Sequence, residues 1–223
     1  MSELMQNDVI TVETAAQPDA TIIWMHGLGA DASDFPPTLP YLSLPESLKI
    51  RFLFPNAPVR PVTVNGGYEM RSWYDILKMG SVREINPSQL DESISRINQM
   101  IDDQISAGIN AQRILLVGFS QGGAVAYETG LQSSTAIGGI AAMSTYLPRQ
   151  LASLAVTAST TLPVLILHGT HDDVVPFSMA EDANTQLKAA GFIPDFNHYS
   201  MAHEVSIESL KALGSWITQR LSI

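Results

Sequence analysis

The chain has 223 residues, of which 45% are hydrophobic and 15% are charged. This length suits one large α/β domain, and the composition excludes a disordered chain, a coiled coil and a collagen-like repeat. Twelve basic and 22 acidic residues give a formal net charge of −10, so we expect no nucleic-acid partner. Because the chain has no cysteine, disulfides, thiolate metal sites and a cysteine nucleophile are excluded.

The first ten residues, MSELMQNDVI, have neither the basic nor the apolar segment of a secretion signal. No apolar run reaches the ~18 residues that a membrane-spanning helix needs. We therefore expect a cytoplasmic protein without a transmembrane segment. No linker divides the sequence, so residues 1–223 are expected to form a single domain, and the sequence leaves a homodimer open.

Short apolar runs rich in β-branched residues recur along the chain, bounded by glycine, proline or polar residues. Near-continuous runs of this length are typical of strands that are buried on both faces of a parallel sheet. The predicted strands span residues 21–25, 50–54, 114–118, 138–143 and 163–167, with weaker candidates at 9–12 and 195–199.

Amphipathic stretches between these runs predict helices. In the clearest, residues 88–107, Asn86 can cap the first turn, Pro87 fits it, and Gly108 can end the helix. Its apolar face is formed by Leu90, Ile94, Ile97, Ile101 and Ile105. The other predicted helices span residues 121–132, 178–190 and 204–221, the last with an apolar face of Ile207, Leu210, Gly214, Ile217 and Leu221. The alternation of strands and helices predicts a doubly wound, mostly parallel α/β sheet.

Residues 55–87 break this pattern because they are rich in proline and glycine and show no long helical stretch. A segment of this kind is unusual in a compact domain and is often functional. Within it, PVTVNGGYEM predicts a small hairpin around Asn65 and Gly66. We call residues 55–80 the flap and expect it to be an insert in the single domain.

The first chemical motif is Gly118-Phe119-Ser120-Gln121-Gly122, which follows a predicted strand and precedes a predicted helix. In this context G-x-S-x-G predicts a sharp turn that exposes the Ser120 hydroxyl above the carboxyl end of the sheet. The N–H of Gln121 can then point at a developing oxyanion. The alternative is a glycine-flanked serine in an ordinary turn, but the position favours a nucleophile.

A serine nucleophile needs a base, and five histidines compete for that role. His203 lies between a strand candidate and the last helix, which is a suitable position for a base above the sheet edge. His26 and His168 precede glycines at strand ends, where we expect them to support their neighbours by hydrogen bonds. His198 lies within a strand, which favours a structural role. We therefore predict His203 as the base.

The acid that orients the base is expected after the strand at 163–167, where Asp172 and Asp173 are adjacent. The residues alone do not choose between these two acids, and a solvated acidic loop is the simpler alternative. A metal cluster of His168, His171 and Asp172 is less favoured, because no further ligands complete it. The order serine, acid, histidine along the chain is that of α/β-hydrolases.

A second glycine loop, His26-Gly27-Leu28-Gly29-Ala30-Asp31, follows the strand at 21–25. Its glycines allow the backbone to approach a ligand closely. The N–H of Leu28 can therefore be a second oxyanion donor beside that of Gln121. A phosphate-binding loop is the alternative, which the absence of a lysine and the acidic net charge disfavour.

Together these motifs resemble the phospholipase/carboxylesterase family of α/β-hydrolases, which includes bacterial carboxylesterases and acyl-protein thioesterases. The resemblance is collinear over about residues 20–220 and rests on HGLGAD, PVTVNGGYEM followed by SWYD, GFSQGG, MSTYLP, HG-x-x-D-x-V-x-P and a late A-H-E turn. It implies an α/β-hydrolase fold without a large cap domain and without a cofactor or metal. The site residues that it implies are the triad Ser120, Asp172 and His203 and the oxyanion donors Leu28 and Gln121. Some bacterial relatives have proline where this chain has Arg71, a departure that is expected to alter the flap.

We therefore predict a serine carboxylesterase that hydrolyses short- to medium-chain acyl esters through an acyl-serine intermediate. Its substrate is a small acyl ester or an acylated molecule. The alternatives are acyl-protein thioesterase or lysophospholipase activity at the same triad, and a non-catalytic binding module. The predicted substrate-binding residues are Tyr68, Met70, Trp73 and Val175. Other flap residues that can contact an acyl chain are Val62, Val64, Ile76 and Leu77, and core packing is the alternative for all the flap residues named.

Overall fold

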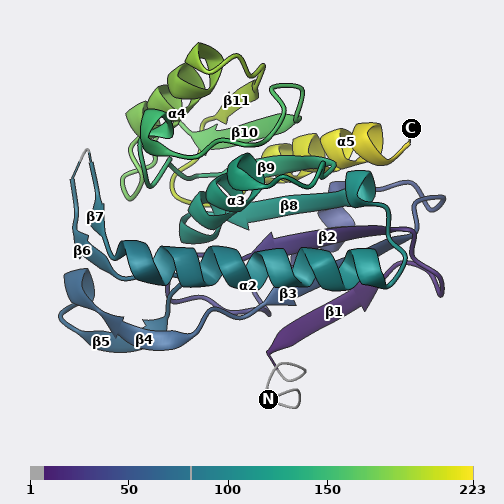
Figure 1. The fold of residues 1–223 in the computed structure, drawn as a ribbon, viewed down its shortest axis with the longest axis horizontal. Helices are drawn as coiled ribbons and strands as arrows, with labels where there is room; N and C mark the ends of the chain where they lie inside the picture. Colours follow the sequence, from purple (N-terminus) through teal and green to yellow (C-terminus); the bar gives the residue numbers. More distant parts are fainter. Residues whose placement is uncertain (1–7, 81, 223) are drawn as a thin grey trace.

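The computed structural model describes residues 8–80 and 82–222, so most of the amino-terminal segment inspected for a secretion signal lies outside the described residues. Its centre is a seven-stranded sheet in the order β1-β3-β2-β8-β9-β10-β11 (Figure 1). All neighbouring strands are parallel except β1, which pairs antiparallel with β3 at one edge. The strands span Val9–Glu13 (β1), Ala20–Met25 (β2), Ile50–Pro55 (β3), Ile114–Phe119 (β8), Gly139–Met143 (β9), Val164–Gly169 (β10) and Asp195–Tyr199 (β11).

Each strand of this sheet lies where an apolar run predicts it. The central strands β2, β9 and β10 are buried at every position, as expected for strands that are covered on both faces. The two weaker candidates are the edge strands β1 and β11, which are only partly buried. Their sequences are less apolar because an edge strand has fewer neighbours to cover it.

Helices cover both faces of the sheet (Figure 1). The helices α2 (Pro87–Ser106), α3 (Gln121–Gln132) and α4 (Phe177–Ala189) lie on one face, and α5 (Ile207–Leu221) lies on the other with the 3₁₀ helix η1 (Pro36–Leu42). Side chains alternate along each strand, so Ile23 and Leu116 join the core under the first group while Ile22 and Val117 join the core under the second. Two further 3₁₀ turns span Ala111–Arg113 (η3) and Leu151–Ser153 (η4).

Helix α2 begins and ends one residue earlier than the predicted 88–107, and its capping residues are the predicted ones. The side chain of Asn86 accepts a hydrogen bond from the N–H of Gln89, and Pro87 occupies the first turn. Gly108 follows the helix with a φ of 95°, a conformation that glycine adopts without strain.

Helix α5 starts later than predicted, at Ile207 instead of residue 204. A capping box between Ser206 and Ser209 sets this start, because each side chain satisfies a backbone N–H of the other residue. The expected place of Ile207 on the apolar face is wrong, since its side chain is 52% exposed. Leu210, Ile217 and Leu221 are buried as predicted.

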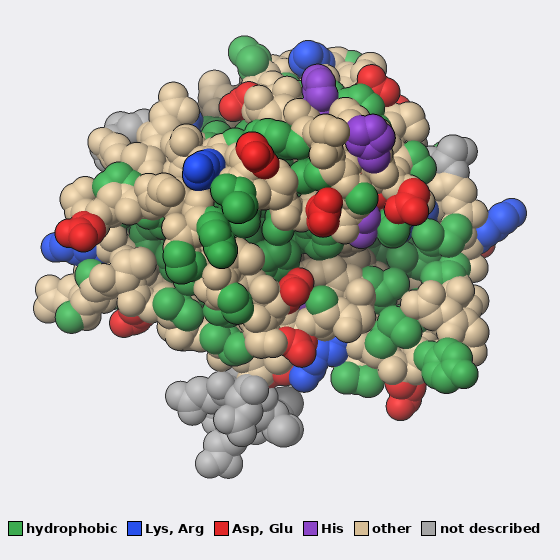
Figure 2. Space-filling view, turned by 180° about the vertical axis from the view of Figure 1, so that it is seen from behind, with side chains coloured by type: hydrophobic (Ala, Val, Ile, Leu, Met, Phe, Trp, Pro, Cys, Tyr) green, Lys and Arg blue, Asp and Glu red, His purple; other side chains and the backbone are tan. Residues whose placement is uncertain are grey.

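The flap forms the predicted hairpin from β4 (Val59–Val62) and β5 (Tyr68–Arg71), joined by the 3₁₀ turn η2 (Thr63–Asn65). Gly66 and Gly67 both have positive φ and complete the turn. The next pair of strands, β6 (Ile76–Lys78) and β7 (Glu84–Ile85), leads into α2. Figure 2 shows apolar side chains gathered at its lower right, where the hairpin lies, and Val59 and Tyr68 are among the exposed apolar residues.

None of the helices in the described part of the chain combines the length and the apolarity that a bilayer crossing requires.

Candidate active site

Ser120 lies in a tight turn between the end of β8 and the start of α3. Its φ of 53° belongs to the left-handed region that non-glycine residues seldom adopt. The turn is held by a hydrogen bond from the Ser120 N–H to the Met143 oxygen (2.9 Å) and by one from Thr145 Oγ1 to the Ser120 oxygen (2.6 Å). A Cβ on Gly118 or Gly122 would lie 2.2 or 2.5 Å from backbone oxygens, so both glycines of the motif are required by packing.

Three side chains from separate turns meet at the carboxyl end of the sheet. His203 Nε2 lies 2.9 Å from Ser120 Oγ, and His203 Nδ1 lies 2.7 Å from Asp172 Oδ2. Because an ionised carboxylate only accepts hydrogen bonds, Nδ1 carries the proton and Nε2 presents its lone pair to the serine hydroxyl. Asp173, the other acid that the sequence left open, is exposed.

Asp172 is held by its own turn. Its Oδ1 accepts hydrogen bonds from the N–H groups of Val174 (3.0 Å) and Val175 (2.7 Å). Burial by itself raises the pKa of this carboxyl, but the hydrogen bonds from His203 and Val175 outweigh it and hold the pKa of Asp172 below its ordinary value. The ionised carboxylate can therefore orient His203 and stabilise its protonated form.

Leu28 and Gln121, whose backbone N–H groups are the predicted oxyanion donors, line the same cavity as Ser120. Neither N–H group has a protein acceptor within residues 8–80 and 82–222. Gln121 is the first residue of α3, so its N–H also lies at the positive end of the helix dipole. The two loops touch closely: a Cβ on Gly122 would lie 2.5 Å from the Met25 oxygen and 2.6 Å from that of His26. This contact fixes one donor relative to the other.

The side chain of Gln121 has a role that the sequence analysis missed. Its Oε1 accepts a hydrogen bond from the Trp73 N–H (2.7 Å), and its Nε2 donates to the Tyr74 oxygen (2.6 Å) and to Ser72 Oγ (3.1 Å). The first helical residue thus joins the end of the flap to the nucleophile turn. The only available signal was a polar side chain at a buried helix start, which fits many roles.

A cavity of about 290 Å³ lies beside Ser120 and His203. One side is formed by the loop that carries Leu28, and another by Phe119, whose ring lies 4.9 Å from that of His203. The rest of its apolar wall comes from Val64, Ile76, Met79 and Val174. Its polar lining includes Asp34, Asn65 and Arg83.

Within the described residues, the flap contributes Val64, Asn65, Ile76 and Met79 to the cavity lining, which contains none of the four predicted substrate-binding residues. Trp73 is fully buried in the core, and its Nε1 donates to the His26 oxygen (2.9 Å). Val175 is also fully buried, while Tyr68 is 75% exposed. The sulfur of Met70 packs against Gly29, 3.6 Å from where a Cβ on that glycine would lie. The structure thus places Trp73 in the core and Val174, not Val175, at the cavity wall, and the residues that contact an acyl chain stay a prediction.

The two histidines at strand ends make the supporting hydrogen bonds predicted for them. The Ala57 N–H donates to Nε2 of His26 (3.0 Å), whose Nδ1 lies 2.7 Å from the Gly27 oxygen. His168 Nε2 lies 2.8 Å from the Val175 oxygen, and burial lowers the pKa of both histidines. In the part of the chain that the structure describes, no group of three histidine or acidic side chains is placed to hold a metal ion.

Arg71, the departure from some bacterial relatives, ties the flap to its surroundings. Its Nη1 donates to the Ala57 oxygen (2.9 Å) and lies 3.4 Å from Asp8 Oδ1. Arg96 Nη2 contacts the other oxygen of Asp8 (3.1 Å), so the same acid connects the flap to α2.

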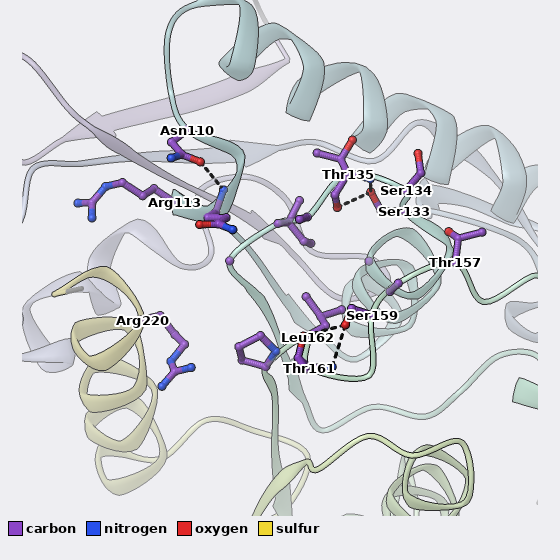
Figure 3. Close-up of a pocket in the computed structure, with 17 residues that line it drawn as sticks. Asn110, Arg113, Ser133, Ser134, Thr135, Thr157, Ser159, Thr161, Leu162 and Arg220 are labelled. Atoms are coloured by element: carbon purple, nitrogen blue, oxygen red, sulfur yellow. Dashed lines mark hydrogen bonds between the residues drawn. The ribbon is translucent and has the colours of Figure 1, made fainter.

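A larger cavity of about 520 Å³ lies at the other end of the strands, where β8 and β9 begin (Figure 3). Hydroxyl side chains such as Ser133, Thr135 and Thr157 surround it together with Arg113 and Arg220. No histidine lines it among the described residues, so we do not assign the chemistry to this cavity.

The fold and the site together define an α/β-hydrolase. The sheet is doubly wound, a serine lies in a strand-to-helix turn, an acid follows a later strand, and a histidine precedes the last helix. Residues 6–221 match the model of the phospholipase/carboxylesterase family, and the chain belongs to that family. It is accordingly a hydrolase of the carboxylesterase and thioesterase kind.

Named relatives and a solved structure agree with this assignment. The chain is 34% identical over 207 residues to carboxylesterase SOBER1 of Arabidopsis thaliana, with 90% of each chain covered. It is 33% identical over 221 residues to acyl-protein thioesterase 1 homolog 1 of Dictyostelium discoideum, covering 98% of this chain and 97% of that protein. The crystal structure of Arabidopsis thaliana SOBER1 matches with a TM-score of 0.85 at 32% identity, covering 91% of this chain and 99% of the other.

Proposed function

We propose that Ser120, His203 and Asp172 form the catalytic triad of a serine carboxylesterase, with the N–H groups of Leu28 and Gln121 as its oxyanion hole. The observation that carries the proposal is the chain of two hydrogen bonds from Ser120 Oγ through His203 to Asp172. Each partner is fixed by a different turn of the same sheet edge, as nucleophilic catalysis requires.

In this mechanism Ser120 Oγ attacks the acyl carbonyl while His203 Nε2 takes the hydroxyl proton. The two backbone N–H groups stabilise the negative charge on the carbonyl oxygen of the tetrahedral intermediate. The intermediate breaks its bond to the leaving alcohol, which receives the proton from His203, and acyl-Ser120 remains. A water molecule, deprotonated by the same histidine, then attacks the acyl group and releases the acid and free Ser120.

The size of the cavity supports acyl groups of short to medium length. Its volume of about 290 Å³ is at the small end of ligand-binding cavities. The apolar wall of Val64, Ile76 and Met79 favours a hydrocarbon chain over a polar one.

Thioester hydrolysis is the second candidate, because a relative named acyl-protein thioesterase shares nearly the whole length of the chain. The same triad and oxyanion hole serve an ester and a thioester, which differ only in the leaving group. Matched oxygen and sulfur esters of one acyl group would rank the two activities by kcat/KM.

Covalent labelling with a fluorophosphonate tests the nucleophile. We expect one label on the wild-type chain and none on Ser120→Ala, with esterase activity reduced about 10⁴-fold or more. Ser144→Ala is a matched control, since Ser144 is also buried and also has a positive φ, but its hydroxyl donates to the Glu204 oxygen. A Ser120→Ala protein that is still labelled and fully active would contradict the assignment.

The cytoplasmic location and a homodimer stay predictions. Fractionation of cells that produce the protein tests the first, and sedimentation of the purified chain tests the second.

A further inference from the structure

Arg83 is a buried arginine between two cavities: it lines the active-site cavity and, together with Tyr146, a second cavity of about 310 Å³. Its side chain is only 8% exposed and lines the same cavity as Ser120. Its Nη2 donates to the Val174 oxygen (2.6 Å), and its guanidinium carbon lies 4.6 Å from the centre of the Tyr146 ring. Its Nε is buried without a hydrogen-bond partner in the described residues.

Most other arginines of the chain are paired with an acid. Six of the seven lie within ion-pair distance of a carboxylate: Arg51, Arg60, Arg71, Arg96, Arg113 and Arg149. The seventh, Arg220, also has no such partner among the described residues, but it does not line the active-site cavity. Arg83 has no such partner within residues 8–80 and 82–222, although acids exceed bases by ten in this chain. Asp34 shares the lining of the cavity but does not lie within ion-pair distance of Arg83.

Burying a charged side chain is costly unless an opposite charge or several hydrogen bonds compensate it. One carbonyl and one aromatic ring compensate Arg83 in part, and the described part of the chain supplies no counterion for its charge. The planar fork of a guanidinium matches the two oxygens of a carboxylate or a phosphate. A substrate that carries such a group would supply the missing negative charge.

We propose that Arg83 binds a carboxylate or phosphate group on the substrate, so that this enzyme prefers esters that are anionic at a distance from the scissile bond. The inference rests on the proposed function, because it concerns the ester that Ser120 attacks. The apolar lining of Val64, Ile76 and Met79 calls for an apolar stretch between the ester and the anion. The anion can belong to the acyl group or to the alcohol, and the experiment separates the two sources.

Two matched substrate pairs measure the preference. On the acyl side, the 4-nitrophenyl monoester of adipic acid is compared with 4-nitrophenyl hexanoate. On the alcohol side, the hexanoyl ester of 3-hydroxypropyl phosphate is compared with that of propane-1,3-diol. We expect the anionic member of one pair to have a kcat/KM higher by about tenfold or more, as for a hydrogen bond to a charged group in a buried site.

Variants then assign this preference to one residue. Arg83→Met should lower the anionic-to-neutral ratio of kcat/KM by about tenfold to a hundredfold, and Arg83→Lys should retain part of it. Lys78→Met is the matched control, because it removes the same charge from an exposed position on β6, outside the cavity lining. It should leave the ratio unchanged.

If Arg83→Met lowers kcat/KM equally for both members of each pair, the proposal is overturned. A residue that only binds the Val174 oxygen or stacks on Tyr146 would affect charged and neutral substrates alike. A wild-type ratio at or below one for both pairs would overturn the proposal as well, even if Arg83→Met fails to fold. Failure of the proposed function itself is distinct, since wild-type protein would then hydrolyse neither neutral ester and take up no fluorophosphonate label.

Discussion

The turns that carry the triad and the flap both border the active-site cavity, but they are held in different ways. The triad turns are residues 118–122, 169–175 and 200–204, and backbone contacts join them. The His171 N–H donates to the Met201 oxygen (3.1 Å), and a Cβ on Gly169 would lie 2.3 Å from that same oxygen. There is no room for one methyl group between the acid turn and the histidine turn.

The flap is held mainly by side chains. Gln121 joins it to the nucleophile turn, and Asp75 accepts hydrogen bonds from the N–H (2.8 Å) and the hydroxyl (2.6 Å) of Thr63 within it. At the tip, a Cβ on Gly67 would meet nothing within 4 Å. The difference indicates that the geometry of the reaction is fixed by the backbone, whereas the wall that contacts the substrate can change through a few side chains.

The largest expected effect separates two adjacent acids in one triad turn. Asp172→Asn should lower kcat about 10⁴-fold, because an amide in place of the carboxylate favours the wrong tautomer of His203. Asp173→Asn should change kcat little, since Asp173 is exposed and the carboxylate that His203 contacts is that of Asp172. Steady-state kinetics on a 4-nitrophenyl ester checks both variants. A larger loss of kcat in Asp173→Asn than in Asp172→Asn would identify Asp173 as the acid of the triad.

The next prediction contrasts a glycine of a triad turn with one of the flap. Gly118→Ala forces a Cβ to within 2.2 Å of the Gly122 oxygen, and we expect a loss of about 3–5 kcal/mol in the free energy of unfolding, or no folded protein. Gly67→Ala has space but a φ of 78°, so it should cost only about 1–2 kcal/mol. Urea unfolding measures both. Equal losses would remove the distinction between the two regions.

This contrast also explains how much the sequence could predict. The motif around Ser120 predicts the conformation of the nucleophile turn, because that turn admits few residue types. The positions of the strands follow from their apolar runs. The choice between Asp172 and Asp173 came from family resemblance, since a shift of one residue in a turn leaves no periodic signal.

The flap was less predictable for a physical reason. Trp73 sits in an irregular segment where an apolar side chain can face the core, the cavity or solvent, and only tertiary packing decides among these. Its complete burial was therefore not foreseeable, and neither were the hydrogen bonds from the Gln121 side chain. The unpaired charge of Arg83 likewise depends on which residues the fold brings near it.

A third prediction tests whether Gln121 controls the flap. Gln121→Leu keeps the backbone N–H but removes three hydrogen bonds to residues 72–74, so kcat/KM should fall about 10- to 100-fold as the flap and the oxyanion donor lose their alignment. Hydrogen exchange should rise in residues 58–75 and stay unchanged in α2. Gln132→Leu, at the other end of α3, is the control. If residues 58–75 exchange as in the wild type, the side chain does not hold the flap.

The smallest expected effect concerns the preference for acyl length. Met79 is 48% exposed and lines the cavity, whereas Trp73 is fully buried in the core. Each methylene that an acyl chain buries contributes about 0.8 kcal/mol, or about fourfold in affinity. Met79→Ala removes part of the apolar wall, so it should lower kcat/KM several-fold more for octanoyl than for acetyl esters of 4-nitrophenol. Trp73→Ala should instead lower both by the same factor, because it damages the scaffold without touching the chain. A chain-length effect confined to Trp73→Ala would mean that the flap opens during the reaction and that its core side becomes the binding surface.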